Sequence, residues 1–240
     1  MRVYADNAAT TYLSDVALNT LLDCLKNYNG NPNSLHTDGQ IAKEKLDESR
    51  EKVAKALNAA KPNEIYFTSG GSEADNQALI SAARGLVKKG KKHLISLNIE
   101  HHAILHTLRK LEKEGFEVTL LKPQPNGIVD VKDVEDAIRE DTALVSIMFA
   151  NNEMGAVQPI AEIGKLCHEK GVLFHTDAVQ AAAHLPIDVQ AMNIDMLSLS
   201  AHKFHGPKGV GVLYARNGIR LINVIEGGAQ ERGKRAGTIN

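Results

Sequence analysis

The sequence predicts an α/β protein with a mostly parallel, seven-stranded sheet in three layers, in which one strand is antiparallel. Short apolar runs alternate with longer stretches of helical pattern, as in βαβ units. Several of the runs are almost continuously apolar, which is typical of strands buried on both faces. The runs are Ile65–Thr68, His93–Asn98, Glu117–Leu121, Ala143–Ala150, Val172–Thr176, Asp195–Leu199 and Val210–Ala215.

The connections between these runs determine the direction of the strands. Only about ten residues separate the last two runs, which is too few for a parallel crossover, so this pair is expected to be antiparallel. Most other gaps hold a helical stretch long enough to cross the sheet. These stretches are Glu73–Lys89, Ala103–Glu114, Val131–Arg139 and Ile160–Lys170.

Two further helices, Asp15–Tyr28 and Gln40–Leu57, precede the first strand. They are predicted to form an N-terminal arm that packs away from the sheet. We assign residues 1–30 to this arm as part of a smaller domain, and residues 31–240 to the large domain.

Composition restricts the class of protein. The chain has 240 residues, a hydrophobic content of 43% and a net charge of −1, so a folded domain is expected and a nucleic-acid partner is not. It has no apolar run of about 18 residues and no apolar signal-peptide core, which argues against a membrane protein. Cys24 and Cys167 are too few for a disulfide framework, and the expected location is the cytoplasm.

Polar residues gather just beyond the carboxyl ends of five predicted strands. In a parallel sheet those ends share one edge, which is where ligands bind. The sequence therefore predicts one site built from several distant segments. The segments are Ser69-Gly70-Gly71-Ser72, Glu100-His101, Asn151-Asn152-Glu153, Asp177 with Gln180, and Ser200 with His202 and Lys203.

The residue types in these segments indicate pyridoxal phosphate. Lys203 offers an amine that could form a Schiff base, and Asp177 a carboxylate that could hold a pyridinium nitrogen. Gly70 and Gly71 would let the backbone approach a phosphate, with Ser72 capping the following helix. Each residue also has an ordinary interpretation: Asp177 could cap a helix or turn, and Lys203 could pair with an acid.

The histidines leave similar alternatives. His101 could stack on a flat ring and move protons, while His202 and Ser200 could bind phosphate, and Gln180 could reach the phenolic oxygen of the ring. His102 and His106 are four residues apart on a predicted helix, a spacing suitable for zinc. No third ligand is evident, so no metal site is predicted.

These motifs, in this order, resemble the cysteine desulfurases of the NifS type. Those are pyridoxal-phosphate enzymes of fold type I, the aspartate-aminotransferase fold, and the resemblance implies the large domain of that fold. It spans almost the whole chain. The matching stretches include Ala5-Asp6-Asn7-Ala8-Ala9-Thr10-Thr11, Thr68-Ser69-Gly70-Gly71-Ser72-Glu73, Ser200-Ala201-His202-Lys203, Gln230-Glu231-Arg232-Gly233 and Ala236-Gly237-Thr238.

The resemblance implies a role for each matching residue. Lys203 would carry the Schiff base, Asp177 would pair with the ring nitrogen and His101 would stack on the ring. Thr238 would reach the phosphate of the partner subunit in a homodimer. Gly71, Ser72, Ser200 and His202 would bind the phosphate, and Asn152 and Gln180 would lie near the ring oxygen and the substrate.

The resemblance also implies a reaction and its partners. L-cysteine would yield alanine and an enzyme persulfide, which would supply an iron–sulfur scaffold or another sulfur acceptor. The family's persulfide cysteine and the rest of its small domain are expected beyond Asn240, and Cys24 and Cys167 are expected to be packing residues. This chain is therefore expected to be inactive in full turnover. The alternatives are a selenocysteine lyase or aminotransferase of the same fold, and a non-catalytic dimerising or scaffold module.

Overall fold

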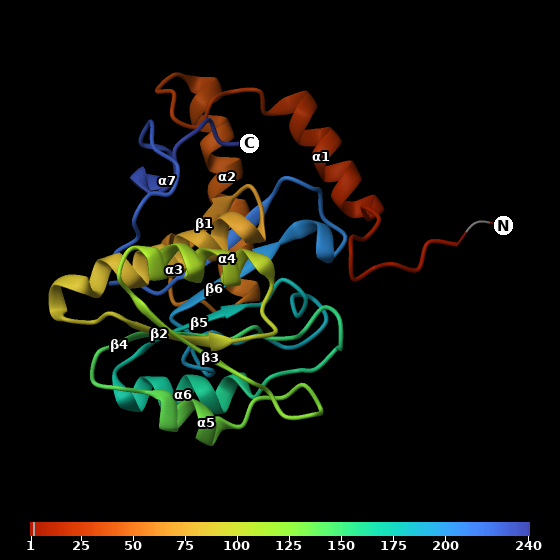
Figure 1. Ribbon diagram of the computed structural model, residues 1–240. Helices are drawn as coiled ribbons and strands as arrows, with labels where there is room; N and C mark the ends of the chain where they lie inside the picture. Colours follow the sequence, from red (N-terminus) through yellow and green to blue (C-terminus); the bar gives the residue numbers. More distant parts are fainter. Residues whose placement is uncertain (2) are drawn as a thin grey trace.

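The computed structural model describes residue 1 and residues 3–240, and its centre is a single twisted sheet (Figure 1). In the described part of the chain seven strands have the order β1-β7-β6-β5-β4-β2-β3. All neighbouring pairs are parallel except those of β7, which runs antiparallel to both β1 and β6. The strands are β1 (Ile65–Thr68), β2 (His93–Leu97), β3 (Glu117–Leu121), β4 (Thr142–Ser146), β5 (Leu173–Asp177), β6 (Met196–Ser200) and β7 (Gly211–Ala215).

The predicted fold class is confirmed, including the antiparallel last pair. The predicted strand Ala143–Ala150 is too long, because β4 ends at Ser146. Beyond it, the N–H groups of Ile147 and Phe149 still donate to the carbonyls of His175 and Asp177, so the chain remains close to β5. This extension brings residues 148–152 to the edge of the sheet where β5 ends.

Helices cover both faces of the sheet, as Figure 1 shows, with α3 and α4 on one face and α5 and α6 on the other. Alternate strand residues face opposite layers: Leu144 packs with α3 and α4, whereas Val145 packs with the α6 side. The helices are α1 (Asp15–Asn27), α2 (Thr37–Ala56), α3 (Gly71–Leu86), α4 (His102–Lys113), α5 (Val131–Ala137), α6 (Ile160–Lys170) and the short α7 (Gln230–Gly233).

The two N-terminal helices behave differently. Every residue of α1 is half-buried or exposed, as predicted for an arm. The prediction is wrong for α2, whose Ala54 and whose neighbour Leu57 belong to the core on the α6 side of the sheet. Its Arg50 donates to the carbonyl of Ile65 in β1, so α2 is tied to the sheet. No helix in the described ranges is both long and apolar enough to cross a membrane.

Candidate active site

The carboxyl ends of the parallel strands open into one cavity of about 410 Å³. It brings together residues that lie far apart in the sequence, as predicted from the strand ends. Of the predicted segments, Ser69, Gly70, Glu100, Asn151 and Glu153 do not line it, and neither does Thr238, whereas the other predicted site residues do. These are Gly71, Ser72, His101, Asn152, Asp177, Gln180, Ser200, His202 and Lys203.

Lys203 enters this cavity from a short 3-10 turn directly after β6. Its side chain is half-buried, and its Nζ donates a hydrogen bond to the carbonyl oxygen of Ala8. Burial lowers the pKa of Lys203, although the negative charges of Asp177 and Asp6 oppose that change. A lysine in this environment is neutral, and therefore nucleophilic, more often than a surface lysine at the same pH.

Asp177 is the last residue of β5, whereas the sequence predicted that it would lie one residue beyond the end of this strand. Its carboxylate is buried, and this burial raises its pKa. The N–H of Val179 and the charges of His101 and Lys203 act in the opposite direction, because they favour the ionised carboxylate. One oxygen, Oδ1, accepts the Val179 N–H at 2.9 Å, so the turn interpretation is also correct. Among residue 1 and residues 3–240, no lysine or arginine forms a salt bridge with Asp177, and a cation in the cavity would stabilise its charged form.

Asp75 lines the same cavity, and the sequence-based reasoning missed it. It is fully buried in α3, with Oδ1 at 3.8 Å from Nε2 of His175, and Oδ1 has no hydrogen-bond partner within the described ranges. Burial and the nearby Asp177 raise the pKa of Asp75 well above its usual value, which favours its neutral form. Asp75 could have been recognised in the sequence as a carboxylate on the apolar face of a predicted helix, beside Ala74 and Ala78.

His101 is the N-cap of α4, and this fixes its ring. Its Nδ1 accepts the N–H of Ala103 at 3.1 Å. Potential ligand atoms of Asp75, His101 and Asp177 lie within 4.8 Å of one another, a spacing that a metal ion would also accept. The rings of His102 and His106 stack on the exposed side of α4 with centroids 5.2 Å apart, and they are absent from the lining of the described cavity.

The start of α3 forms the anion-binding end of the cavity. Gly70 is the N-cap and Gly71 the first helical residue, so the prediction that Ser72 caps this helix is wrong. Ser72 lies in the first turn, where N–H groups have no partner within the helix. A Cβ on Gly71 would approach Cγ2 of Val179 to 2.7 Å, which shows how closely the backbone approaches the cavity wall. This arrangement suits a phosphate group.

Ser200 and His202 lie on the β6 side of this anion-binding end. Burial lowers the pKa of His202, and the positive charges of Lys203 and Lys208 lower it further. The neutral ring has its Nδ1 at 3.1 Å from the Thr10 hydroxyl. His202 can therefore offer a neutral N–H to an anion, as predicted.

The N-terminal segment lines the open side of the cavity through Asp6, Ala8 and Ala9. The carbonyl of Ala8 accepts hydrogen bonds from both Lys203 and Gln180, the latter at 2.9 Å. The N–H of Thr11 donates to the carbonyl of His202 at 2.9 Å, which anchors the segment. The residue pattern did not predict this contact, because nothing local indicates a pairing across almost 200 positions.

Thr238 lies apart from the other predicted residues. It lines a second cavity of about 370 Å³, together with Cys24 and Tyr28 of the α1 region and Phe67 of β1. The single chain therefore does not bring Thr238 to its own Lys203 cavity.

Comparison with known proteins assigns the family. Residues 3–231 match the family model described as aminotransferase class-V. The chain belongs to this family. The cysteine desulfurase IscS of Clostridium botulinum is 56% identical over 239 residues, covering all of this chain and 60% of the relative. This class-V protein thus spans about 60% of the length of the curated relatives that it matches.

Solved structures agree with that assignment. A NifS-like protein superposes on the class-V chain with a TM-score of 0.96 at 42% identity, covering 100% of this chain and 66% of the other. The structure of SspA in complex with cysteine gives a TM-score of 0.94, also at 42% identity, covering 99% and 69% of the two chains. The family and the Lys203–Asp177 pair favour a cofactor over a metal ion in this cavity.

The two thiols of this class-V protein should react very differently. Cys167 is fully buried, and burial together with Asp195 raises its pKa to about 12, so its reactive thiolate is almost absent near neutral pH. Cys24 is half-buried at the second cavity. We expect iodoacetamide to label Cys24 in the folded protein and Cys167 only after unfolding, as measured by mass spectrometry. Labelling of both in the folded state would contradict the packing role of Cys167.

Proposed function

We propose that the protein acts as a pyridoxal-phosphate-dependent cysteine desulfurase, which converts L-cysteine to alanine and transfers the sulfur to an enzyme thiol as a persulfide. The observation that carries this proposal is the convergence of Lys203, Asp177 and the start of α3 on one cavity. The SspA structure with cysteine supports a cysteine substrate, since its fold matches at a TM-score of 0.94.

The residues present fit the cofactor. Asp177 is a buried carboxylate suited to a ring N–H⁺, and the start of α3 with Ser200 and His202 is suited to a phosphate. When bound, pyridoxal phosphate would supply an electron sink for breaking bonds next to the substrate's Cα. We assign the phosphate to Gly71, Ser72, Ser200 and His202, and the ring face to His101.

The remaining residues orient the substrate and move protons. Lys203 Nζ, whose pKa burial lowers, can accept a proton from Cα of cysteine and return one later. His101 lies at the same cavity, and the ring nitrogen that the Ala103 N–H does not occupy can donate or accept a proton there. Asn152 and Gln180 supply amide groups at the same cavity, and we assign them to the ring oxygen and the substrate.

We further propose a cytoplasmic homodimer in which Thr238 contacts the phosphate bound by the partner subunit. Its place outside the Lys203 cavity supports this, because within one chain it lines a different cavity. An iron–sulfur scaffold or another sulfur acceptor is the proposed protein partner. A persulfide must pass its terminal sulfur to such an acceptor before the thiol can react again.

Lys203→Ala tests the proposal directly. We expect the unaltered protein to turn yellow with pyridoxal phosphate, and Lys203→Ala to lose that absorbance because the amine is gone. Visible absorbance after removal of free cofactor provides the measurement. Lys110→Ala, at an exposed lysine of α4, is the matched control and should remain yellow.

A colourless unaltered protein would overturn the proposal, and so would a Lys203→Ala variant with undiminished colour. Added L-cysteine separates the desulfurase from a related pyridoxal enzyme. In a protein that also carries the family's persulfide cysteine, the desulfurase predicts alanine together with a protein persulfide, whereas an aminotransferase would convert cysteine to its 2-oxo acid. Sulfide release that depended on Cys24 or Cys167 would contradict their packing roles.

A further inference from the structure

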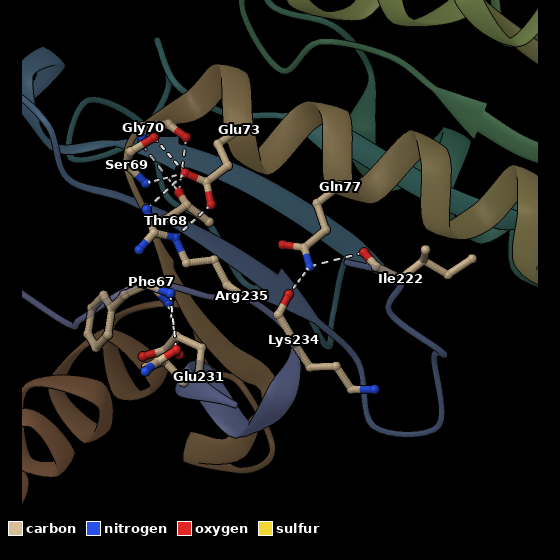
Figure 2. A network of polar contacts seen from close by, with 12 residues as sticks. Phe67, Thr68, Ser69, Gly70, Glu73, Gln77, Ile222, Glu231, Lys234 and Arg235 are labelled. Atoms are coloured by element: carbon tan, nitrogen blue, oxygen red, sulfur yellow. Dashed lines mark hydrogen bonds and ion pairs between the residues drawn. The ribbon is translucent and has the colours of Figure 1, made fainter. Parts of the chain in front are cut away.

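The C-terminal segment from Ile222 to Thr238 is fastened to the start of α3 by a polar network, shown in Figure 2. Gln77 of α3 donates from Nε2 to the carbonyls of Ile222, at 3.2 Å, and Lys234, at 2.6 Å. One turn earlier on the same helix, Glu73 binds Arg235. The segment thus lies along α3 and ends beside the loop that precedes it.

Glu73 connects the segment with that loop. Its Oε2 accepts hydrogen bonds from the N–H of Ser69 at 2.8 Å and from the Ser69 hydroxyl at 2.5 Å. Its Oε1 accepts from Arg235 Nε at 2.9 Å, and Nη2 lies 3.4 Å from Oε2. The Glu73 side chain is 8% exposed, and in Figure 2 the loop and the guanidinium converge on it.

These contacts hold Glu73 ionised. Burial acts to raise its pKa, but the donors from Arg235 and Ser69 outweigh burial and lower it. A charged carboxylate with several donors fixes its partners more firmly than a neutral group would. The N–H and the hydroxyl of Ser69 both bind Glu73, and Ser69 lines the second cavity rather than the Lys203 cavity. Two residues further on, Gly71 begins α3 and lines the Lys203 cavity.

We propose that Glu73 is a positioning residue for phosphate recognition, and that Arg235 acts through it. Glu73 fixes the Ser69–Gly71 loop in the shape that presents the start of α3 to a phosphomonoester. Arg235 lies three residues before Thr238, so the same carboxylate would also fix the segment that carries Thr238. This inference rests on the proposed function, because it concerns the phosphate end of the same cofactor site.

The test compares pyridoxal 5′-phosphate with pyridoxal, which lacks the phosphate. For Glu73→Gln we expect about tenfold weaker binding of pyridoxal 5′-phosphate, the effect of losing a charge-assisted hydrogen bond, and nearly unchanged binding of pyridoxal. Arg235→Gln should act in the same direction, and the double variant should lose little more than Glu73→Gln alone, since both interrupt one connection. Spectroscopic titration measures both affinities.

Glu114→Gln provides a matched control, because Glu114 also accepts two bonds from an arginine, Arg84, but at the exposed end of α4. It should bind both ligands as the unaltered protein does. If the ratio of the two affinities stayed the same in Glu73→Gln and Arg235→Gln, the inference would be wrong but the proposed function would stand. This includes an equal loss for both ligands, which would indicate a general loosening of the site. Absent binding of pyridoxal 5′-phosphate by the unaltered protein would overturn the proposed function as well.

Discussion

Replacing Arg50 with alanine is expected to lower the free energy of unfolding by about 3–5 kcal/mol, the usual effect of breaking a buried ion pair. Arg50 pairs with Glu231 through two bonds of 2.9 Å, and the two side chains are 7% and 1% exposed. Removing the guanidinium leaves the Glu231 carboxylate buried, and within the described part of the chain the Phe67 N–H, at 3.2 Å, is the one donor that remains. An unpaired buried charge accounts for most of the loss.

Urea unfolding of the two variants Arg50→Ala and Arg84→Ala measures the difference. Arg84 makes an equally well-formed fork with Glu114, at 3.0 and 2.8 Å, but the two side chains are 40% and 31% exposed. Its removal should lower the free energy of unfolding by at most about 1 kcal/mol. Equal losses in the two variants would show that burial does not set the strength of the Arg50 pair.

A double substitution distinguishes the pair's own contribution from the penalty of an orphaned charge. Arg50→Met with Glu231→Leu removes both charges and leaves apolar side chains in their place. It should be more stable than Arg50→Ala, because no charge remains buried without a partner. If it were as unstable as Arg50→Ala, the attachment of the C-terminal segment to β1 would itself be the main stabilising element.

The sequence predicted the strands and most helices because they depend on local patterns. The strands β2 and β4 are buried at every position, and three of the five residues in each are apolar. The gap before β7 is too short for a parallel crossover, so an antiparallel return was expected. The position of α2 could not be predicted from its own sequence. Its polar surface matches that of an exposed arm, and its attachment depends on Arg50 meeting Ile65 and Glu231, which is 181 positions away.

The site was predictable to the extent that strand ends define it. His101, Asp177 and Lys203 could be placed at one edge because each lies at or just beyond the carboxyl end of a strand of the mostly parallel sheet. Asp75 and the segment from Asp6 to Ala9 could not, since one lies within a helix and the other reaches the cavity only through long-range bonds to Gln180 and Lys203. The cap of α3 was misplaced by two residues because Gly70 and Ser72 both suit that position.

Asp177→Asn is expected to weaken binding of pyridoxal phosphate about ten- to hundredfold, the range for a lost hydrogen bond to a charged group. Asparagine keeps the size of the side chain and can still accept the Val179 N–H, so the end of β5 should keep its shape. It cannot balance a positive ring nitrogen. Spectroscopic titration with the cofactor at neutral pH measures the loss, and circular dichroism checks the fold.

Asp75→Asn provides the sharpest control, because both carboxyls are buried in the same cavity and only one is expected to carry charge. Burial and Asp177 raise the pKa of Asp75 well above its usual value, so a neutral amide should replace it with little change in cofactor affinity. Burial also raises the pKa of Asp177, so acidification should protonate it sooner than an exposed aspartate. Lowering the pH should therefore reduce the cofactor affinity of the unaltered protein toward that of Asp177→Asn. The affinity of Asp177→Asn should not show this pH dependence, because asparagine has no carboxyl group to protonate. If Asp75→Asn lost the cofactor as strongly as Asp177→Asn, the charge would be shared between the two carboxyls, and the assignment of the ring nitrogen to Asp177 alone would be wrong.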